Sequence, residues 1–173
     1  SSDYILYQGP WILGDWVNYS LIYSGSDQNG IPVQPDTIEV STDLITNYLG
    51  RNFYSPSNNA SIQVPADFED NFNIISYESS YELFCELFNG ANVNLYPQTE
   101  VIFIGPNEYI LQHPLELTFN IPEEITGNNP KIYHFVDNHW VNMGGEVKDG
   151  EVITLIDELG NFILFTGDHT PIH

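Results

Sequence analysis

Basic side chains are nearly missing from this sequence. Its 173 residues include 24 acidic side chains but only three basic ones, Arg51, Lys131 and Lys148, so the formal net charge is -21. A field of this sign repels phosphate backbones and anionic lipid headgroups. The composition therefore predicts no nucleic-acid partner and no membrane-surface partner, and it leaves cations as candidates.

Cysteine is equally scarce, since Cys85 is the only one. A single cysteine excludes an internal disulfide framework. Its neighbours in "YELFCELF" are mostly apolar, which favours a buried, inert thiol over a nucleophile.

Long apolar runs, low-complexity tracts and clear repeats are also lacking. No stretch approaches membrane-spanning length, so we predict no membrane insertion, and no signal-peptide pattern is recognisable. What remains, 42% hydrophobic and 14% aromatic residues, suffices to bury a core and predicts one domain over residues 1–173. A mature secreted protein and an excised module both fit these features.

A strand between two prolines gives the clearest local pattern. Leu115, Leu117 and Phe119 alternate with polar residues after Pro114, in "PLELTFNIP". Because proline cannot donate to a sheet ladder, it suits the first position of a strand. We therefore predict a half-buried strand that begins at Pro114.

Turn signals recur along the second half of the chain. Asp137-Asn138 and Asp149-Gly150 each predict a hairpin, the second with Lys148 opposite Glu151. Short strands separated by turns every 8 to 12 residues or so are typical of sandwiches and barrels. The predicted fold is mainly β, an antiparallel β-sandwich of the ZU5-like or immunoglobulin-like kind.

Two segments before residue 92 favour short helices. In "SSYELFCELFNG", Ser79 is a candidate N-cap, Gly90 a candidate C-terminal stop, and the apolar residues share a helical face. The earlier "STDLITNYLG", residues 41–50, has a similar but weaker pattern because of its Ile and Thr. We expect one or two short helices.

The N-terminal stretch "YILYQGPWILGDWVNYSLIYSG" is long, apolar and aromatic. Such a stretch must bury itself in its own domain or in a neighbour. Within one chain it completes the sandwich, which is the favoured interpretation. Inserted into the next copy, it joins subunits of a filament by strand addition. At the other end, residues 167–173 are predicted to form a disordered or loosely docked tail.

The acid excess has three interpretations. The favoured one is a solvated surface, the second is calcium, which takes oxygen ligands from clustered acidic side chains, and the third is a high-salt habitat. The candidate calcium ligands are Asp67, Glu69 and Asp70 in "PADFEDN", with Asp27 and Asn29 as a second stretch. Neither stretch has EF-hand spacing, and no cofactor is required by any motif.

Histidines allow a second metal hypothesis. His134 and His139 would be diagonal neighbours on one face of the first hairpin, where long side chains can bridge to a transition metal. The favoured alternative is that both are surface or sheet-edge histidines.

Motifs of catalysis do not occur. The sequence has no nucleophile elbow, phosphate loop or metalloprotease helix, and pairs such as Glu123-Glu124 arise by chance in so acidic a chain. We therefore predict that the protein is not an enzyme. Trp11, Trp16 and Trp140 are expected in the core, while an exposed aromatic platform for sugar rings remains an alternative.

Residues from 55 to 166 or so resemble the ZU5 family of surface proteins. A "G-P-x-x-x-x-F-x-x-P-V/L-x-L-T" strand pair typical of that family is matched by Gly105, Pro106, Pro114, Leu115, Leu117 and Thr118, with Ile110 or Leu111 in the aromatic position. Residues 1–50 lie outside the resemblance.

The resemblance implies a sandwich used for interaction or assembly. Some relatives cleave themselves at a His-Phe-Ser motif, but Gly160-Asn161-Phe162-Ile163 stands at the comparable place, so it implies no self-cleavage here. We accordingly expect a non-enzymatic, extracellular structural module of a cell surface, serving adhesion or assembly through a protein partner or its own copies. A filament subunit and a carbohydrate-binding module are the alternatives.

Overall fold

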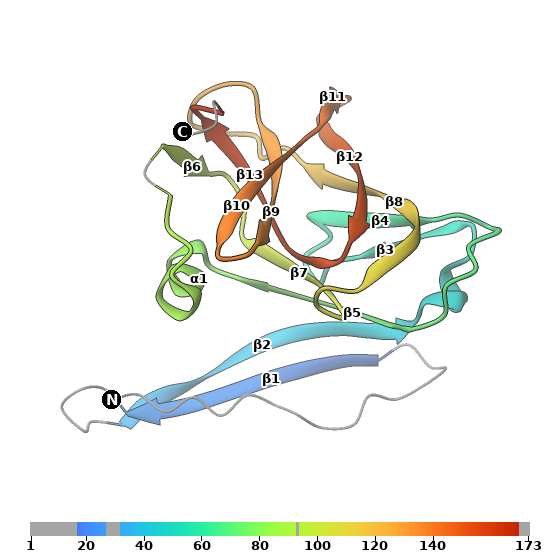
Figure 1. The fold of residues 1–173 in the computed structure, drawn as a ribbon. Coiled ribbons are helices and arrows are strands. Elements are labelled where there is room, and N and C mark those ends of the chain that lie inside the picture. The colour runs from blue at the N-terminus through green and yellow to red at the C-terminus, as the bar shows by residue number, and fades with distance from the viewer. Residues whose placement is uncertain (1–16, 27–31, 93, 170–173) are drawn as a thin grey trace.

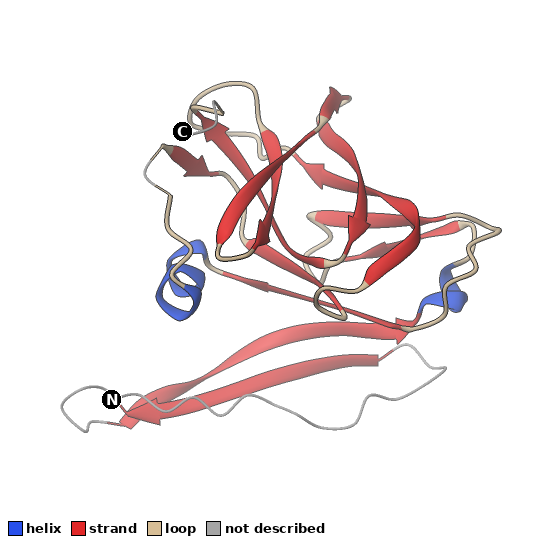
Figure 2. Ribbon diagram, in the orientation of Figure 1, coloured by secondary structure: helices blue, strands red, loops and turns tan. Residues whose placement is uncertain are grey.

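Two antiparallel sheets packed as a sandwich make up most of the computed structural model, which describes residues 17–26, 32–92 and 94–169 (Figures 1 and 2). The mainly β prediction is therefore confirmed. The large sheet has the strand order β1-β2-β5-β7-β13-β9-β10, with β6 also pairing with β13. The small sheet has the order β11-β12-β8-β4-β3.

The strands of the large sheet are β1 (Val17–Ser26), β2 (Pro32–Leu44), β5 (Asn73–Ser79), β6 (Leu95–Pro97), β7 (Val101–Gly105), β9 (Lys131–Val136), β10 (His139–Gly144) and β13 (Gly160–Gly167). Those of the small sheet are β3 (Arg51–Tyr54), β4 (Ala60–Val64), β8 (Ile110–Asn120), β11 (Glu146–Lys148) and β12 (Glu151–Glu158).

The main core lies between the sheets. Leu115, Leu117 and Phe119 of β8 are buried as their alternation predicts, and Phe162 and Leu164 of β13 meet them from the large sheet. Full burial of such side chains contributes roughly 1.5–3 kcal/mol each. This layer is what fixes the two sheets against each other.

Pro114 does not begin its strand, as the sequence had indicated, because β8 starts at Ile110. β8 pairs regularly with β12 from Asn120 back to Leu115, and the next paired residue toward the start of β8 is Ile110. Pro114 therefore lies in an interruption of the ladder, where a missing N–H costs little.

A second core covers the outer face of the large sheet. Ile163 and Phe165 of β13 point to this side, where helix α1 (Tyr81–Phe88) places Phe84 against them. Trp140 is 8% exposed and its ring centroid lies 5.3 Å from that of Phe84. The predicted core position of Trp140 is confirmed.

Both helix predictions need adjustment at their ends. The hydroxyl of Ser80, not Ser79, accepts the capping hydrogen bond from the Leu83 N–H, and Asn89, not Gly90, adopts the left-handed conformation that ends α1. The weaker segment is mostly strand, because β2 continues to Leu44 and only Ile45–Tyr48 form a 3-10 helix. Pairing with β5 overrides the helical pattern there.

Both hairpins are confirmed. Val136 pairs with His139 around Asp137 and Asn138, whose φ angles are 52° and 64°. Around Asp149-Gly150, Lys148 pairs with Glu151. Positive φ angles at both turn positions are typical of the type I′ turn.

Strands β1 and β2 form a long ribbon at one edge of the large sheet (Figure 1). β1 pairs with β2 from Val17 to Ser26, whereas β2 pairs with β5 only through Val40 to Leu44. The second half of the apolar N-terminal stretch is thus a strand of the large sheet. Residues 1–16, with Trp11 and Trp16, lie outside the described residues.

Candidate functional site

Strand β1 is the longest free edge of the described structure. β1 and β10 end the large sheet and β3 and β11 end the small one. β3 has four residues, β11 three and β10 six, while β1 has ten. Proteins normally keep edge strands short or interrupted, because an open edge can pair with another chain.

The composition of the ribbon makes its two edges unequal. β1 reads "VNYSLIYSGS" and contains no charged residue and no proline. The part of β2 that extends beyond β5 carries Pro32, Pro35, Asp36 and Glu39. Proline and charge are devices that block edge pairing, so β2 is guarded where β1 is open.

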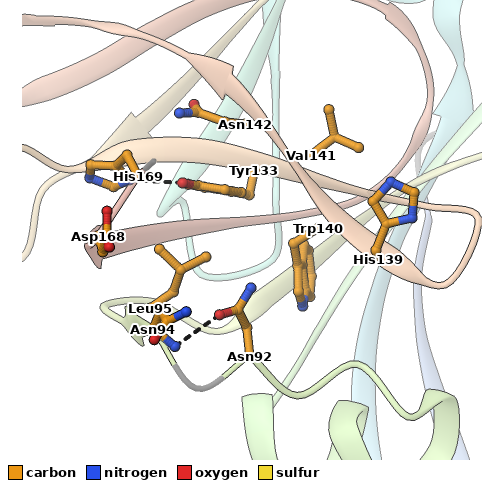
Figure 3. A pocket seen from close by; sticks show the side chains of 10 residues that line it. All are labelled: Asn92, Asn94, Leu95, Tyr133, His139, Trp140, Val141, Asn142, Asp168 and His169. Carbon is orange, nitrogen blue, oxygen red and sulfur yellow. Dashed lines mark hydrogen bonds between the residues drawn. The ribbon is translucent and has the colours of Figure 1, made fainter. Parts of the chain in front are cut away.

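A pocket of about 550 Å³ lies at the opposite edge of the large sheet, beside β10 (Figure 3). Tyr133 of β9 and Val141 and Asn142 of β10 contribute one side of this β10 pocket. Asn92 and Asn94, in the loop before β6, contribute the other. Residues far apart in the sequence are brought together there by the β9–β10 hairpin.

The C-terminal end of the described chain closes one wall of the pocket. The Asp168 N–H donates to the Asn94 carbonyl at 3.0 Å, and His169 Nε2 donates to the Asn129 carbonyl at 2.8 Å. When the ring is neutral, His169 Nδ1 then accepts from the Tyr133 hydroxyl, 2.8 Å away. Residues 168 and 169 are therefore hydrogen-bonded to the rest of the domain, while the other tail residues, 170–173, lie outside the described part.

The Tyr133 hydroxyl remains protonated in this arrangement. Burial, helped by the charge of Asp168, raises the pKa of Tyr133. A protonated hydroxyl that donates to His169 fixes the ring in one orientation.

The base of the pocket is apolar and fixed. The indole Nε1 of Trp140 donates to the Gly90 carbonyl at 2.6 Å. Leu95, which is buried, and Val141, which is 37% exposed, add aliphatic surface. Trp140 is thus a wall of the pocket and not an exposed stacking platform.

Two asparagine side chains on the rim accept a hydrogen bond through their oxygen, while their nitrogen donates none to the described residues. Asn92 Oδ1 accepts from the Asn94 N–H at 3.0 Å, and Asn142 Oδ1 accepts from the Gly144 N–H at 2.7 Å. The described residues supply no acceptor for either Nδ2 group. His139 Nδ1 donates to the Asp137 carbonyl at 3.0 Å, which leaves its Nε2 as an acceptor when the ring is neutral.

His134 and His139 do not behave alike. His139 is exposed, as predicted for a surface histidine. His134 is only 5% exposed, and its ring stacks on that of Phe162 with centroids 4.4 Å apart. The predicted surface or edge position of His134 is therefore wrong. Burial lowers the pKa of His134 to about 4, against the opposing charge of Asp157. His134 lies on the side of the large sheet that faces the main core, the same side as Ile132 and Phe162.

The three predicted calcium ligands differ in their exposure to solvent. Asp67 and Glu69 are exposed, whereas Asp70 is 3% exposed and its Oδ2 accepts from the Gln112 N–H at 3.1 Å. Its Oδ1 is buried and has no hydrogen-bond partner in the described structure. Over residues 17–26, 32–92 and 94–169 no three His, Cys, Asp or Glu side chains are placed to hold a metal ion. Calcium therefore stays a prediction, and the Asp27–Asn29 stretch lies outside the described residues.

Comparisons with known proteins give no identity. No protein-family model matches the chain, and no curated protein matches it. The resemblance to ZU5 domains accordingly stays a prediction. In the described part of the chain no helix is long and apolar enough to cross a membrane.

Sequence reasoning missed both the open edge and the pocket. The contrast between an uncharged β1 and a proline-containing β2 is visible in the sequence once the two strands are known to pair. The pocket has no such signal, because its walls come from three separate parts of the chain: Asn92, Asn94 and Leu95; Tyr133 and residues 139–142; and residues 168–169.

Proposed function

We propose that this protein is a non-enzymatic interaction module of a cell surface that assembles with its own copies by strand addition to β1. The observation that carries the proposal is the edge of β1 that pairs with no other strand of the described residues; β1 is ten residues long and has no charge and no proline. Main-chain hydrogen bonds along such an edge supply affinity for an extended segment.

The segment that we propose as the added strand is residues 4–16 of a neighbouring copy. This segment, "YILYQGPWILGDW", directly precedes β1 and is longer than the edge that it would cover. Eight of its thirteen residues are Tyr, Trp, Ile or Leu, and the aromatic and β-branched ones among them favour strands. A second copy of this chain could therefore supply the added strand, and no other protein is needed.

Charge favours contact through these parts of the chain. Each copy carries a formal charge of -21, so two copies repel each other. Residues 4–26 nevertheless contain one charged side chain, Asp15. Association through residues 4–26 brings the fewest like charges together, and added salt should strengthen it by screening the rest.

Three full-length variants with the same change in charge test the proposal. Leu21→Lys lies in β1, Ile12→Lys lies in the proposed added strand, and Leu155→Lys replaces a side chain that is 62% exposed on the small sheet. Sedimentation velocity over a concentration series should show assembly of the wild type and of Leu155→Lys. The first two variants should need at least about tenfold more protein, because a lysine guards an edge.

Two results would count against it. A wild type that stays monomeric from about 0.01 M to about 0.15 M salt would exclude assembly under conditions where repulsion is screened. Equal assembly of all three variants would place the contact elsewhere.

Support for a non-enzymatic, extracellular role comes from the sequence. It has no catalytic motif, and the strong acid excess suits a solvated external surface. Hydrolytic turnover that a single carboxylate substitution abolishes would overturn this part of the proposal.

A further inference from the structure

We propose that the β10 pocket binds a neutral saccharide. Its volume of about 550 Å³ falls within the range of roughly 300–1,000 Å³ that is usual for small-ligand sites. The proposal concerns a site at the opposite edge of the large sheet from β1, so it does not depend on the assembly proposed above.

Hydrogen-bonding groups on the rim suit hydroxyl groups. The Nδ2 groups of Asn92 and Asn142 are available as donors, because the oxygen of each amide is held by a backbone N–H. His139 Nε2 is available as an acceptor when the ring is neutral. A sugar hydroxyl both donates and accepts, so it can satisfy groups of both kinds.

Charge disfavours anionic ligands. No lysine or arginine lines the pocket, while Asp168 does. The formal charge of -21 adds a repulsive field around it. Phosphates, sulfated sugars and uronic acids are therefore poor candidates, and uncharged hydroxyl-bearing molecules remain.

The apolar wall suits the C–H faces of a sugar ring. Leu95 and Trp140 supply carbon surface near Asn92, and Val141 lies across the β10 strand from Trp140, as Figure 3 shows. The wall is fixed before a ligand arrives, because Trp140 is bonded to Gly90 and Tyr133 to His169. A fixed site loses less conformational entropy on binding.

Full-length protein with Trp11→Phe and Trp16→Phe provides the test, since Trp140 then reports on the pocket alone. The neutral probes are maltotriose, cellotriose, mannotriose and N,N′,N″-triacetylchitotriose, and trigalacturonate is the acidic counterpart. We expect at least one neutral trisaccharide to change Trp140 fluorescence with saturation, and trigalacturonate not to do so. Isothermal titration calorimetry on the wild type provides a second readout.

Isosteric substitutions connect binding to the rim. Asn92→Asp and Asn142→Asp each keep the oxygen that accepts a backbone N–H and replace the available Nδ2 donor. Each should weaken binding about tenfold, the effect of one lost hydrogen bond together with an unfavourable charge. Asn52→Asp, an exposed site on β3, makes the same change in charge and should bind as the wild type does.

Three outcomes would overturn the proposal. Absence of any response to the four neutral probes by both methods would exclude a neutral saccharide site. Binding that survives Asn92→Asp and Asn142→Asp would place the ligand elsewhere. A response to the polyamine spermidine but to no trisaccharide would identify a cation site built on Asp168.

Discussion

His134 shows how burial can outweigh the charge of a nearby carboxylate. The ring lies flat on Phe162, and a Cβ built on Gly160 would come within 2.7 Å of its Nε2. Desolvation disfavours the imidazolium, so the pKa of His134 falls to about 4 from an ordinary value of 6.5. Asp157 opposes this shift but does not reverse it.

The low pKa of His134 predicts a pH-dependent stability. The unfolded chain binds the imidazole proton more tightly than the folded one, so this contribution is intact above about pH 6.5 and is lost as the pH falls toward about 4. Urea midpoints of wild type and His134→Gln should therefore converge over that interval. Parallel curves would show that His134 does not titrate differently in the two states.

Asp70 is the residue at which the calcium prediction is best tested. Its buried Oδ1 has no hydrogen-bond partner among the described residues, and a bound cation would satisfy it. The prediction expects millimolar calcium to raise the melting temperature relative to chelator, through binding to the folded state. The rise should disappear in Asp70→Asn and persist in Glu123→Gln, an exposed site elsewhere. A midpoint that calcium leaves unchanged in the wild type would remove the idea.

At the scale of elements, Phe84 is the buried residue of helix α1, while Tyr81 adds an edge-to-face contact with Phe165 at 5.6 Å between centroids. Phe84 is 2% exposed and its ring meets Phe135 at 4.9 Å between centroids and Trp140 at 5.3 Å. Phe88, one turn later, is 51% exposed. The outer core of the large sheet therefore depends on Phe84.

Truncating these two residues should have unequal effects. Phe84→Ala should lower the free energy of unfolding by about 3–5 kcal/mol, the usual loss for a buried aromatic side chain. Phe88→Ala should cost less than about 1 kcal/mol, because surface substitutions rarely cost more. Urea denaturation of both variants measures the difference. Comparable losses would mean that Phe88 is buried in solution.

Local patterns predicted the elements that depend on local chemistry. The two turns with positive φ angles, and the alternation through Leu115, Leu117 and Phe119, are properties of adjacent residues, and they were predicted correctly. The end of α1 was misplaced by one residue because Asn89 adopts the left-handed conformation, which asparagine tolerates better than most residues other than glycine.

Features that depend on distant residues were not predicted. His134 was placed at the surface because its burial requires β13, which follows it by more than twenty residues, to supply Phe162. The docking of residues 168 and 169 likewise requires Asn94 and Asn129. Long-range pairing of this kind leaves no periodic signal in the sequence.

At the scale of the whole molecule, the two candidate sites lie at opposite edges of one sheet. β1 ends the large sheet on one side and β10 on the other, with five strands between them. Strand addition at β1 would therefore leave the β10 pocket accessible in every copy. An assembly of this kind would present many weak binding sites together, which raises avidity without new contacts.

Amide hydrogen exchange of β1, above and below the assembly concentration, tests the central claim most directly. The account predicts that alternate amides between Val17 and Ser26 gain protection on assembly, because those facing the free edge become hydrogen-bonded. The edge strands β3 and β11 should not change. Assembly with unchanged exchange in β1, or with protection gained at β3 or β11 instead, would contradict strand addition at this edge.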